Sequence, residues 1–248
     1  MRDVTAMRDN WESSFAAQIR SQAYNTAAVG DLVRNVAYYL REIRPDGGYA
    51  GLRFLELGCG AGPNLVWLAQ KGITVSGLDI APSALALCRD NLARAGHAAL
   101  VADLSEGSVH ETPYPDAAFD GILESCVFQH LPRDIREKAF AEVFRLLKPG
   151  GLFCGHMLGR GHTVYQSRKD QELAEDPGTL VLHEGGSRFY LTDTGLSHFF
   201  SRGELLGLLD GFSLADPCLS EYELPAFESK KRGYDRYRQS MWAVYAVK

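Results

Sequence analysis

A glycine-rich turn preceded by an acidic residue stands at residues 56–62, which read Glu-Leu-Gly-Cys-Gly-Ala-Gly. It follows an apolar stretch at 52–57 and precedes Pro63, a residue that favours the first turn of a helix. Glycines let the backbone approach a ligand closely at the carboxyl edge of a parallel sheet. The turn therefore predicts a nucleotide-like ligand, although several cofactor classes use such a turn.

Acidic residues follow the next predicted strands. Asp79 ends the strand at 73–79 and lies 21 residues after Gly58, the spacing at which a carboxylate meets ribose hydroxyls. Asp103 follows a short predicted strand at 98–102, where its carboxylate could accept a hydrogen bond from an exocyclic amine. A strand at 120–127 contains Glu124 and Ser125, and a Lys-Pro-Gly-Gly turn occupies 148–151.

Together these five blocks, in this order, resemble the class I S-adenosylmethionine-dependent methyltransferases over about residues 50–157. The resemblance implies that Glu56 and Gly58 border the methionine amino group and that Asp79 binds both ribose hydroxyls. It further implies that Asp103 with Leu104 holds the adenine and that the backbone near Glu124 and Ser125 completes the methionine side. The remaining residues of the expected cofactor site are Gly60 and Gly62, which form the close turn, together with Asn64 and Ile80.

A nicotinamide dehydrogenase is the main alternative for a glycine turn of this kind. The spacing here is Gly-x-Gly-x-Gly, whereas dinucleotide binding uses Gly-x-Gly-x-x-Gly. Glu56 suits a cationic ammonium and would repel a pyrophosphate. Both observations favour S-adenosylmethionine as the cofactor.

The elements that must position these residues alternate between strand and helix. Helices are predicted at 27–43, from Pro63, from Pro82, at 132–147 and at 201–210, and further strands at 151–157, near 212–218 and at 240–247. Successive β-α units predict an α/β fold, a doubly wound sheet with helices on both faces. The resemblance implies a Rossmann-like sheet of seven strands, mostly parallel, with the last strand antiparallel.

The chain is interpreted as one domain with four parts. Residues 1–50 form a helical lead-in that either covers the cofactor as a lid or packs on the edge of the core, and 51–157 form the cofactor-binding core. Residues 158–199, called the insertion below, depart from the regular alternation, as substrate-binding segments often do. Residues 200–248 complete the sheet.

A general base is needed only if the methyl acceptor carries a proton at working pH. His130, after the fourth predicted strand, is a candidate, with packing or capping as the alternative role. In the insertion, His183 and Tyr165 are the preferred candidates. The scattered histidines do not show a metal-ligand spacing, so no metal is predicted.

Charge and composition narrow the partners. The net charge of −5 predicts neither a nucleic-acid partner nor an anionic membrane surface. Five widely spaced cysteines fit a reducing compartment, and neither a signal peptide nor an apolar run of membrane-spanning length is recognised. We therefore expect a cytoplasmic protein that acts on a small molecule, with no prediction of oligomeric state.

The leading hypothesis is transfer of a methyl group to an oxygen or nitrogen of a small metabolite. An alternative is another use of the same cofactor, such as cyclisation or aminocarboxypropyl transfer, because the motifs report the bound cofactor and not the bond that breaks. A third hypothesis is a catalytically silent binding protein. The intact set of Glu56, Gly58, Gly60, Asp79 and Asp103 argues against it.

Overall fold

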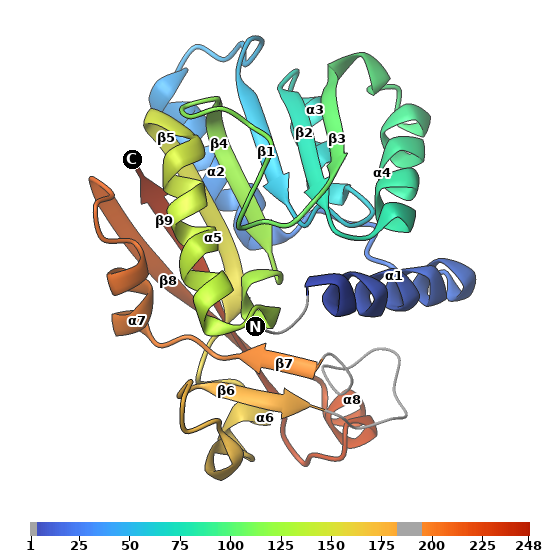
Figure 1. Ribbon diagram of the computed structural model, residues 1–248, viewed down its shortest axis with the longest axis vertical. Coiled ribbons are helices and arrows are strands. Elements are labelled where there is room, and N and C mark those ends of the chain that lie inside the picture. Colours follow the sequence, from blue (N-terminus) through green and yellow to red (C-terminus); the bar gives the residue numbers. More distant parts are fainter. Residues whose placement is uncertain (1–3, 183–194) are drawn as a thin grey trace.

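The computed structural model describes residues 4–182 and 195–248, and within them a seven-stranded sheet dominates (Figure 1). The strand order is β3-β2-β1-β4-β5-β9-β8. The strands are β1 (Arg53–Leu57), β2 (Thr74–Asp79), β3 (Val101–Glu106), β4 (Phe119–Ser125), β5 (Leu147–Leu158), β8 (Leu214–Glu223) and β9 (Arg238–Val247). β9 pairs antiparallel with both β5 and β8, whereas the pairs from β3 to β5 are parallel. The predicted fold class is confirmed.

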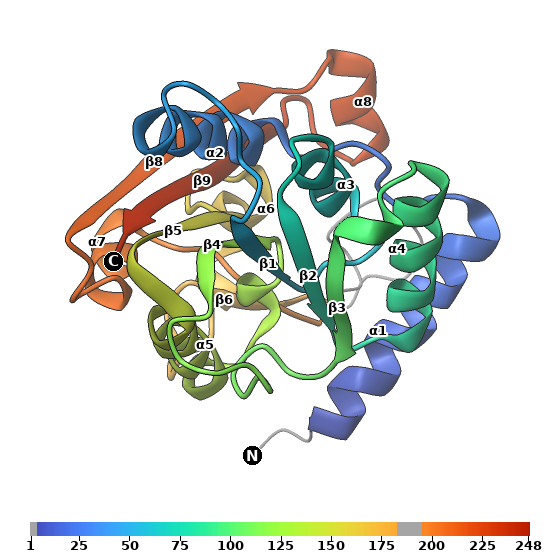
Figure 2. The ribbon, with the colours of Figure 1, turned by 90° about the horizontal axis from the view of Figure 1, so that it is seen from above.

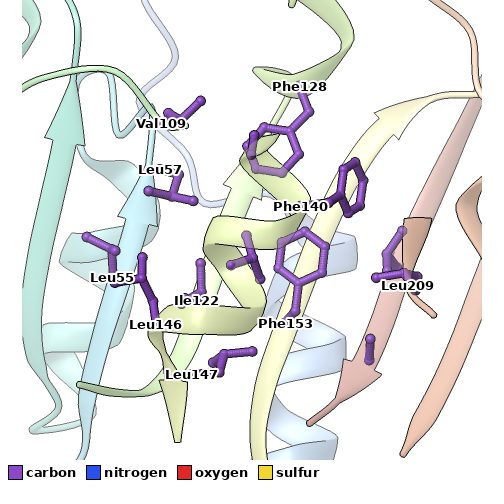
Figure 3. Packing of buried hydrophobic residues seen from close by; sticks show 14 of the residues in the cluster. Leu55, Leu57, Val109, Ile122, Phe128, Phe140, Leu146, Leu147, Phe153 and Leu209 are labelled. Atoms are coloured by element: carbon purple, nitrogen blue, oxygen red, sulfur yellow. The ribbon is translucent and has the colours of Figure 1, made fainter. Parts of the chain in front are cut away.

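Helices cover both faces of this sheet (Figure 2). α2 (Gly30–Ile43), α3 (Pro63–Gln70) and α4 (Pro82–Arg94) bury apolar side chains against one face, in a cluster that includes Val36, Leu65 and Leu85. α5 (Arg133–Leu146) and α7 (Arg202–Leu208) cover the other face. There, aromatic rings from α5 and from the strands interlock, as Figure 3 shows for Phe140 and Phe153. This packing makes the sheet a rigid platform for the residues at its carboxyl edge.

Several strand boundaries differ from those predicted, among them the ends of β8, which runs to Glu223, and those of β3 and β5. Residues 98–100 form a short 3-10 turn, and β3 begins at Val101 and runs to Glu106, where the prediction ended the strand at 102. β5 begins at Leu147 because the Lys-Pro-Gly-Gly turn is itself part of the strand, paired through Leu147 with Phe119. The longer β3 moves the end of that strand, with consequences for Asp103 described below.

The insertion forms a small unit below the sheet in Figure 1. It contains α6 (Thr163–Gln166), a 3-10 turn at Lys169–Gln171, and strands β6 (Thr179–Leu182) and β7 (Gly195–His198), which pair antiparallel. A buried ion pair ties it to α5: the Arg136 guanidinium lies 2.7 Å from the Asp176 carboxylate. α8 (Ala226–Lys231) lies between β8 and β9 and was not anticipated from the sequence.

The first helix, α1 (Val4–Ser21), lies across the lower end of the sheet in Figure 1, near the carboxyl ends of the strands. Glu12 accepts hydrogen bonds from the backbone and side chain of Ser83 at the start of α4, both at 3.0 Å. Arg8 donates to Glu106 at the end of β3 over 2.7 Å. These contacts hold α1 over the sheet edge.

Within residues 4–182 and 195–248, none of the helices combines the length and the apolar character required to cross a membrane.

Candidate active site

A cavity of about 260 Å³ opens at the carboxyl ends of β1, β2 and β4, between these strand ends and α1. β2 and β4 flank β1 in the sheet, so the chain leaves the sheet toward opposite sides here, the position at which open α/β sheets bind ligands. The cavity is lined by Met7, Trp11, Phe15, Gln18, Gly58, Gly60, Asp79, Ile80, Ala81, Gly107, Ser108, Val109, Ser125, Cys126, Val127, His130 and Leu131.

The glycine turn forms one wall, and its glycines serve different purposes. Gly58 and Gly60 line the cavity, and their φ angles are 72° and 52°, values that residues other than glycine rarely adopt. A Cβ on Gly58 would also stand 2.3 Å from a methyl carbon of Val127. Gly62 does not line the cavity; there a Cβ would lie 2.4 Å from the sulfur of Cys88, so this glycine lets α3 and α4 approach each other.

Asp79 shapes the same wall. One of its carboxylate oxygens accepts the Gly60 N–H at 2.8 Å, and the other accepts the Ala81 N–H at 2.9 Å. Burial raises the pKa of Asp79, and these backbone donors partly offset the effect. Both oxygens retain acceptor capacity at the cavity, since each carboxylate oxygen can accept two hydrogen bonds. Ile80 follows as an apolar lining residue.

Glu56 lies behind the turn, is 2% exposed and, like Asn64, does not itself line the cavity. Its Oε1 accepts a 2.6 Å hydrogen bond from Asn64, which in turn accepts the Val29 N–H at 2.9 Å. The other oxygen, Oε2, is buried without a hydrogen-bond partner among the described residues. Burial raises the pKa of Glu56 to about 8. A buried acceptor of this kind favours a cationic neighbour.

Glu124 is fully buried at the end of β4 and does not line the cavity. Its Oε1 accepts the N–H groups of Val127 and Phe128 at 2.5 and 3.1 Å, which fixes the turn after the strand. Burial raises the pKa of Glu124 to about 7. The neighbouring Ser125 does reach the cavity.

Asp103 is not where the sequence analysis expected it. Because β3 continues to Glu106, Asp103 lies within the strand and not after it. Its carboxylate accepts hydrogen bonds from Ser105 and, at 2.7 Å, from the Tyr114 hydroxyl. Leu104 points toward Gly77, where a Cβ would stand 2.8 Å from its methyl carbon. Neither Asp103 nor Leu104 lines the cavity; Gly107, Ser108 and Val109 occupy that side.

His130 lies in the cavity wall and is 9% exposed. Its ring stands 5.2 Å from that of Trp11, and burial lowers its pKa to about 4. The imidazole is therefore neutral at ordinary pH, and its low pKa makes it a weak proton acceptor.

The two candidates in the insertion fare differently. Tyr165 does not line the cavity: it packs against Phe199, and its hydroxyl donates to Glu172 over 2.8 Å. Its aromatic ring completes the core of the insertion, so the structure gives the candidate base Tyr165 no contact with this cavity, and its catalytic role stays a prediction. His183 falls outside the described residues.

α1 supplies the outer wall through Met7, Trp11, Phe15 and Gln18. The Phe15 ring would meet a Cβ on Gly60 at 3.5 Å, so it lies directly over the glycine turn. The sequence analysis left open whether residues 1–50 cover the cofactor or pack on the edge of the core; in the structure α1 lines the cavity. Within the described part of the chain, no group of three His, Cys, Asp or Glu side chains is arranged to hold a metal ion.

Comparisons with known proteins agree with this architecture. The family described as "Methyltransferase domain" matches residues 55–155. An uncharacterised methyltransferase of Synechocystis is 33% identical over 104 residues, 42% of this chain and 46% of that protein. A ubiquinone biosynthesis O-methyltransferase of Azoarcus is 32% identical over 136 residues, 51% of this chain and 56% of that protein.

Among solved structures, a 1,6-didemethyltoxoflavin-N1-methyltransferase of Burkholderia thailandensis, with S-adenosylhomocysteine bound, has a TM-score of 0.61 at 18% identity. The match covers 98% of this chain and 88% of that one, and at this identity it shows the fold. The first curated relatives are matched over 36% to 64% of their own length.

Proposed function

Because the chain belongs to the class I S-adenosylmethionine-dependent methyltransferases, with S-adenosylmethionine as cofactor, we propose that it methylates an oxygen or nitrogen of a small organic molecule. The bound cofactor supplies an activated methyl group on a sulfonium. The protein has to align the acceptor with that group and exclude water.

The polar end of the cavity fits this cofactor. Asp79 presents carboxylate oxygens suited to ribose hydroxyls, beside the open backbone of Gly58 and Gly60. Glu56 lies behind this wall, and its buried oxygen without a partner among the described residues would suit the cationic amino group of the methionine portion. Ser108 lines the cavity on the β3 side, where Asp103 does not, and Ser108 with the backbone around it would contact the adenine there.

The observation that carries the proposal is that the same cavity continues from the glycine turn to an apolar wall. Trp11, Phe15 and Leu131 line the same space of about 260 Å³ as Gly58, Gly60 and Asp79. A wall of this kind favours a small apolar or aromatic acceptor and keeps water from the reacting atoms. The described residues that line the cavity include no Lys or Arg, which does not suit a polyanion such as RNA.

The test is incubation of the full chain with methyl-labelled S-adenosylmethionine and a panel of phenols, carboxylic acids and aromatic amines. The nucleoside product is identified by mass spectrometry. We expect S-adenosylhomocysteine to form together with a labelled small molecule, and Asp79→Ala to abolish both at low cofactor concentration. Label found only on macromolecules would contradict the acceptor class, and methylthioadenosine would contradict methyl transfer.

A further inference from the structure

Cys126 occupies an exceptional position in the cavity. It is the first residue after β4, lines the cavity, and has a φ of 59°, a left-handed conformation that costs a non-glycine residue energy. Its backbone N–H donates to the carbonyl oxygen of His156 at 2.9 Å, which fixes this turn to β5. The strain therefore holds a thiol at the point where the chain leaves the sheet.

The side chain of His156 lies directly behind this thiol. Its Nδ1 is 3.7 Å from the Cys126 sulfur, and its Nε2 is 3.6 Å from a carboxylate oxygen of Asp31 on α2. The three groups thus form a line from the cavity toward α2. An acid that orients a histidine, which in turn faces a nucleophile or proton carrier, is the arrangement that activates thiols and hydroxyls.

We propose that Cys126, His156 and Asp31 form a proton relay that accepts the hydrogen of the methyl acceptor. Its catalytic use rests on the proposed function. Cys126 is the group that meets the acceptor; His156 and Asp31 are positioning residues that act through it.

The protons balance as follows. As the acceptor oxygen or nitrogen bonds to the methyl carbon, its proton passes to the Cys126 sulfur while the thiol proton passes to His156 Nδ1. The pair of electrons from the broken carbon–sulfur bond stays on the cofactor sulfur. The Asp31 carboxylate stabilises the resulting imidazolium, which then releases its proton to solvent through a side chain that is 15% exposed.

The charges around His156 favour this direction of transfer. From α2 it faces Asp31, whose other near partner is Arg34 at 3.1 Å. From the β4 side it meets Glu124 and Cys126, and β9 presents Ala243 opposite it in the sheet. Burial lowers the pKa of His156 below its usual 6.5, and the negative charge of Asp31 partly offsets this. The imidazole is therefore neutral, and able to accept a proton, above about pH 6.5.

The experiment needs no substrate: it measures the rate at which iodoacetamide alkylates Cys126 in the full chain between pH 7 and 9, by peptide mass spectrometry. If His156 takes the thiol proton, the rate is nearly level over this range, because His156 is already neutral. A thiol acting alone, with a pKa raised by burial to about 12, would react tenfold faster for each pH unit. A tenfold-per-unit slope in the unmodified protein overturns the relay.

Variants provide the second arm. We expect His156→Gln to slow alkylation of Cys126 at pH 7 at least tenfold and to restore the steep slope, and Asp31→Asn to slow it severalfold. His97→Gln, a partly exposed histidine at another site, is the matched control, and exposed Cys218 is the internal reference thiol in every sample. Equal Cys126 rates in the protein and in His156→Gln would contradict the proposal.

The two proposals fail separately. An alkylation rate that is independent of pH, without a methylated product, would contradict methyl transfer alone. A methylated product together with an alkylation rate that rises steeply with pH would contradict the relay alone.

Discussion

The Nδ1 of His130 lies 2.9 Å from the carbonyl oxygen of Leu196, and this contact joins the cavity wall to the insertion. The direction of the hydrogen bonds follows from Gln129. Its Oε1 accepts the Leu158 N–H at 2.9 Å, so its amide nitrogen faces His130 Nε2 at 3.2 Å. Nε2 therefore accepts, and Nδ1 carries the hydrogen donated to Leu196. A second proton on the ring would break this chain.

The neutral state of His130 predicts a loss of stability in mild acid. Its pKa is about 4 in the folded protein against 6.5 for an ordinary histidine, so the unfolded chain binds the additional proton first. Between pH 6.5 and 4 the free energy of unfolding should fall by up to about 3 kcal/mol from this group. Urea unfolding at several pH values checks this, and His130→Gln should flatten the profile. An unchanged profile in that variant would contradict the assignment.

Glu56 predicts the opposite pH trend. Its pKa of about 8 lies above the usual 4.5, so the folded protein holds a proton that the unfolded chain releases as pH rises. In the absence of cofactor, the free energy of unfolding should therefore fall between pH 4.5 and 8, and Glu56 should contribute a few kcal/mol, on the order of its pKa shift, to this fall. Glu56→Gln should remove that contribution.

Cofactor binding should show the reverse effect at the same residue. A cationic amino group favours the ionised form of Glu56, so the affinity for S-adenosylmethionine should rise with pH up to about 8. Glu56→Gln should bind at least about tenfold more weakly at pH 8, without this pH dependence. Calorimetry in buffers of different ionisation enthalpy would also report the released proton; none released would contradict the role of Glu56.

Asp79 and Asp103 form a matched pair of variants. Asp79→Ala should weaken cofactor binding at least tenfold, about 1.4 kcal/mol, because it removes the carboxylate at the cavity. Asp103→Ala removes a carboxylate outside the cavity and should leave the affinity within about twofold, a small fraction of that free energy. Isothermal titration with S-adenosylhomocysteine distinguishes them. Equal losses would restore Asp103 to the cofactor site.

Trp11 should report the cofactor optically. It lines the cavity, whereas the other two tryptophans, Trp67 and Trp242, do not. Titration with S-adenosylhomocysteine should change the intrinsic fluorescence, and Trp11→Phe should abolish that change while Trp67→Phe retains it. A change that persists in Trp11→Phe would show that α1 does not cover the bound cofactor.

Arg136 predicts a large effect on stability. Its side chain is 2% exposed and bonds to both carboxylate oxygens of Asp176, at 2.7 and 3.3 Å. Arg136→Met leaves a partly buried carboxylate without its partner and should cost about 3–5 kcal/mol. That corresponds to a fall in Tm of roughly 10 °C.

The control for Arg136 is its neighbour on α5. Arg133 pairs with Glu137 at the surface, at 3.0 Å, and Arg133→Met should leave the Tm nearly unchanged, because solvent screens an exposed pair. Thermal unfolding of both variants measures the difference. Similar shifts would mean that the buried pair does not hold the insertion to α5.

The sequence predicted those parts of the site that follow one another locally. Gly58, Gly60 and Asp79 were found because a glycine turn and a strand-end acid have fixed spacing within a β-α-β unit. The place of Asp103 was missed because a strand end cannot be read precisely from alternation, and β3 extends four residues further than predicted. Gly107, directly after β3, was the residue in the sequence that could have indicated where this strand ends.

Other features depend on contacts between distant segments. Asp31, Cys126 and His156 meet only because α2 packs beside β5 and β5 pairs with β4. Similarly, the sequence alone places Arg136 on the polar face of a helix, and only the folded insertion brings Asp176 into contact with it. Such contacts come from tertiary packing, which local patterns do not encode.

The position of β9 between β5 and β8 has a consequence for synthesis on the ribosome. Residues 238–247 are made after both of the strands that they pair with, β5 and β8. Until they emerge from the exit tunnel, β5 exposes a bare edge, and β8 lacks its neighbour in the sheet. A nascent chain stalled before residue 238 should therefore engage chaperones that bind exposed strands, and release them only when residues 238–247 are free.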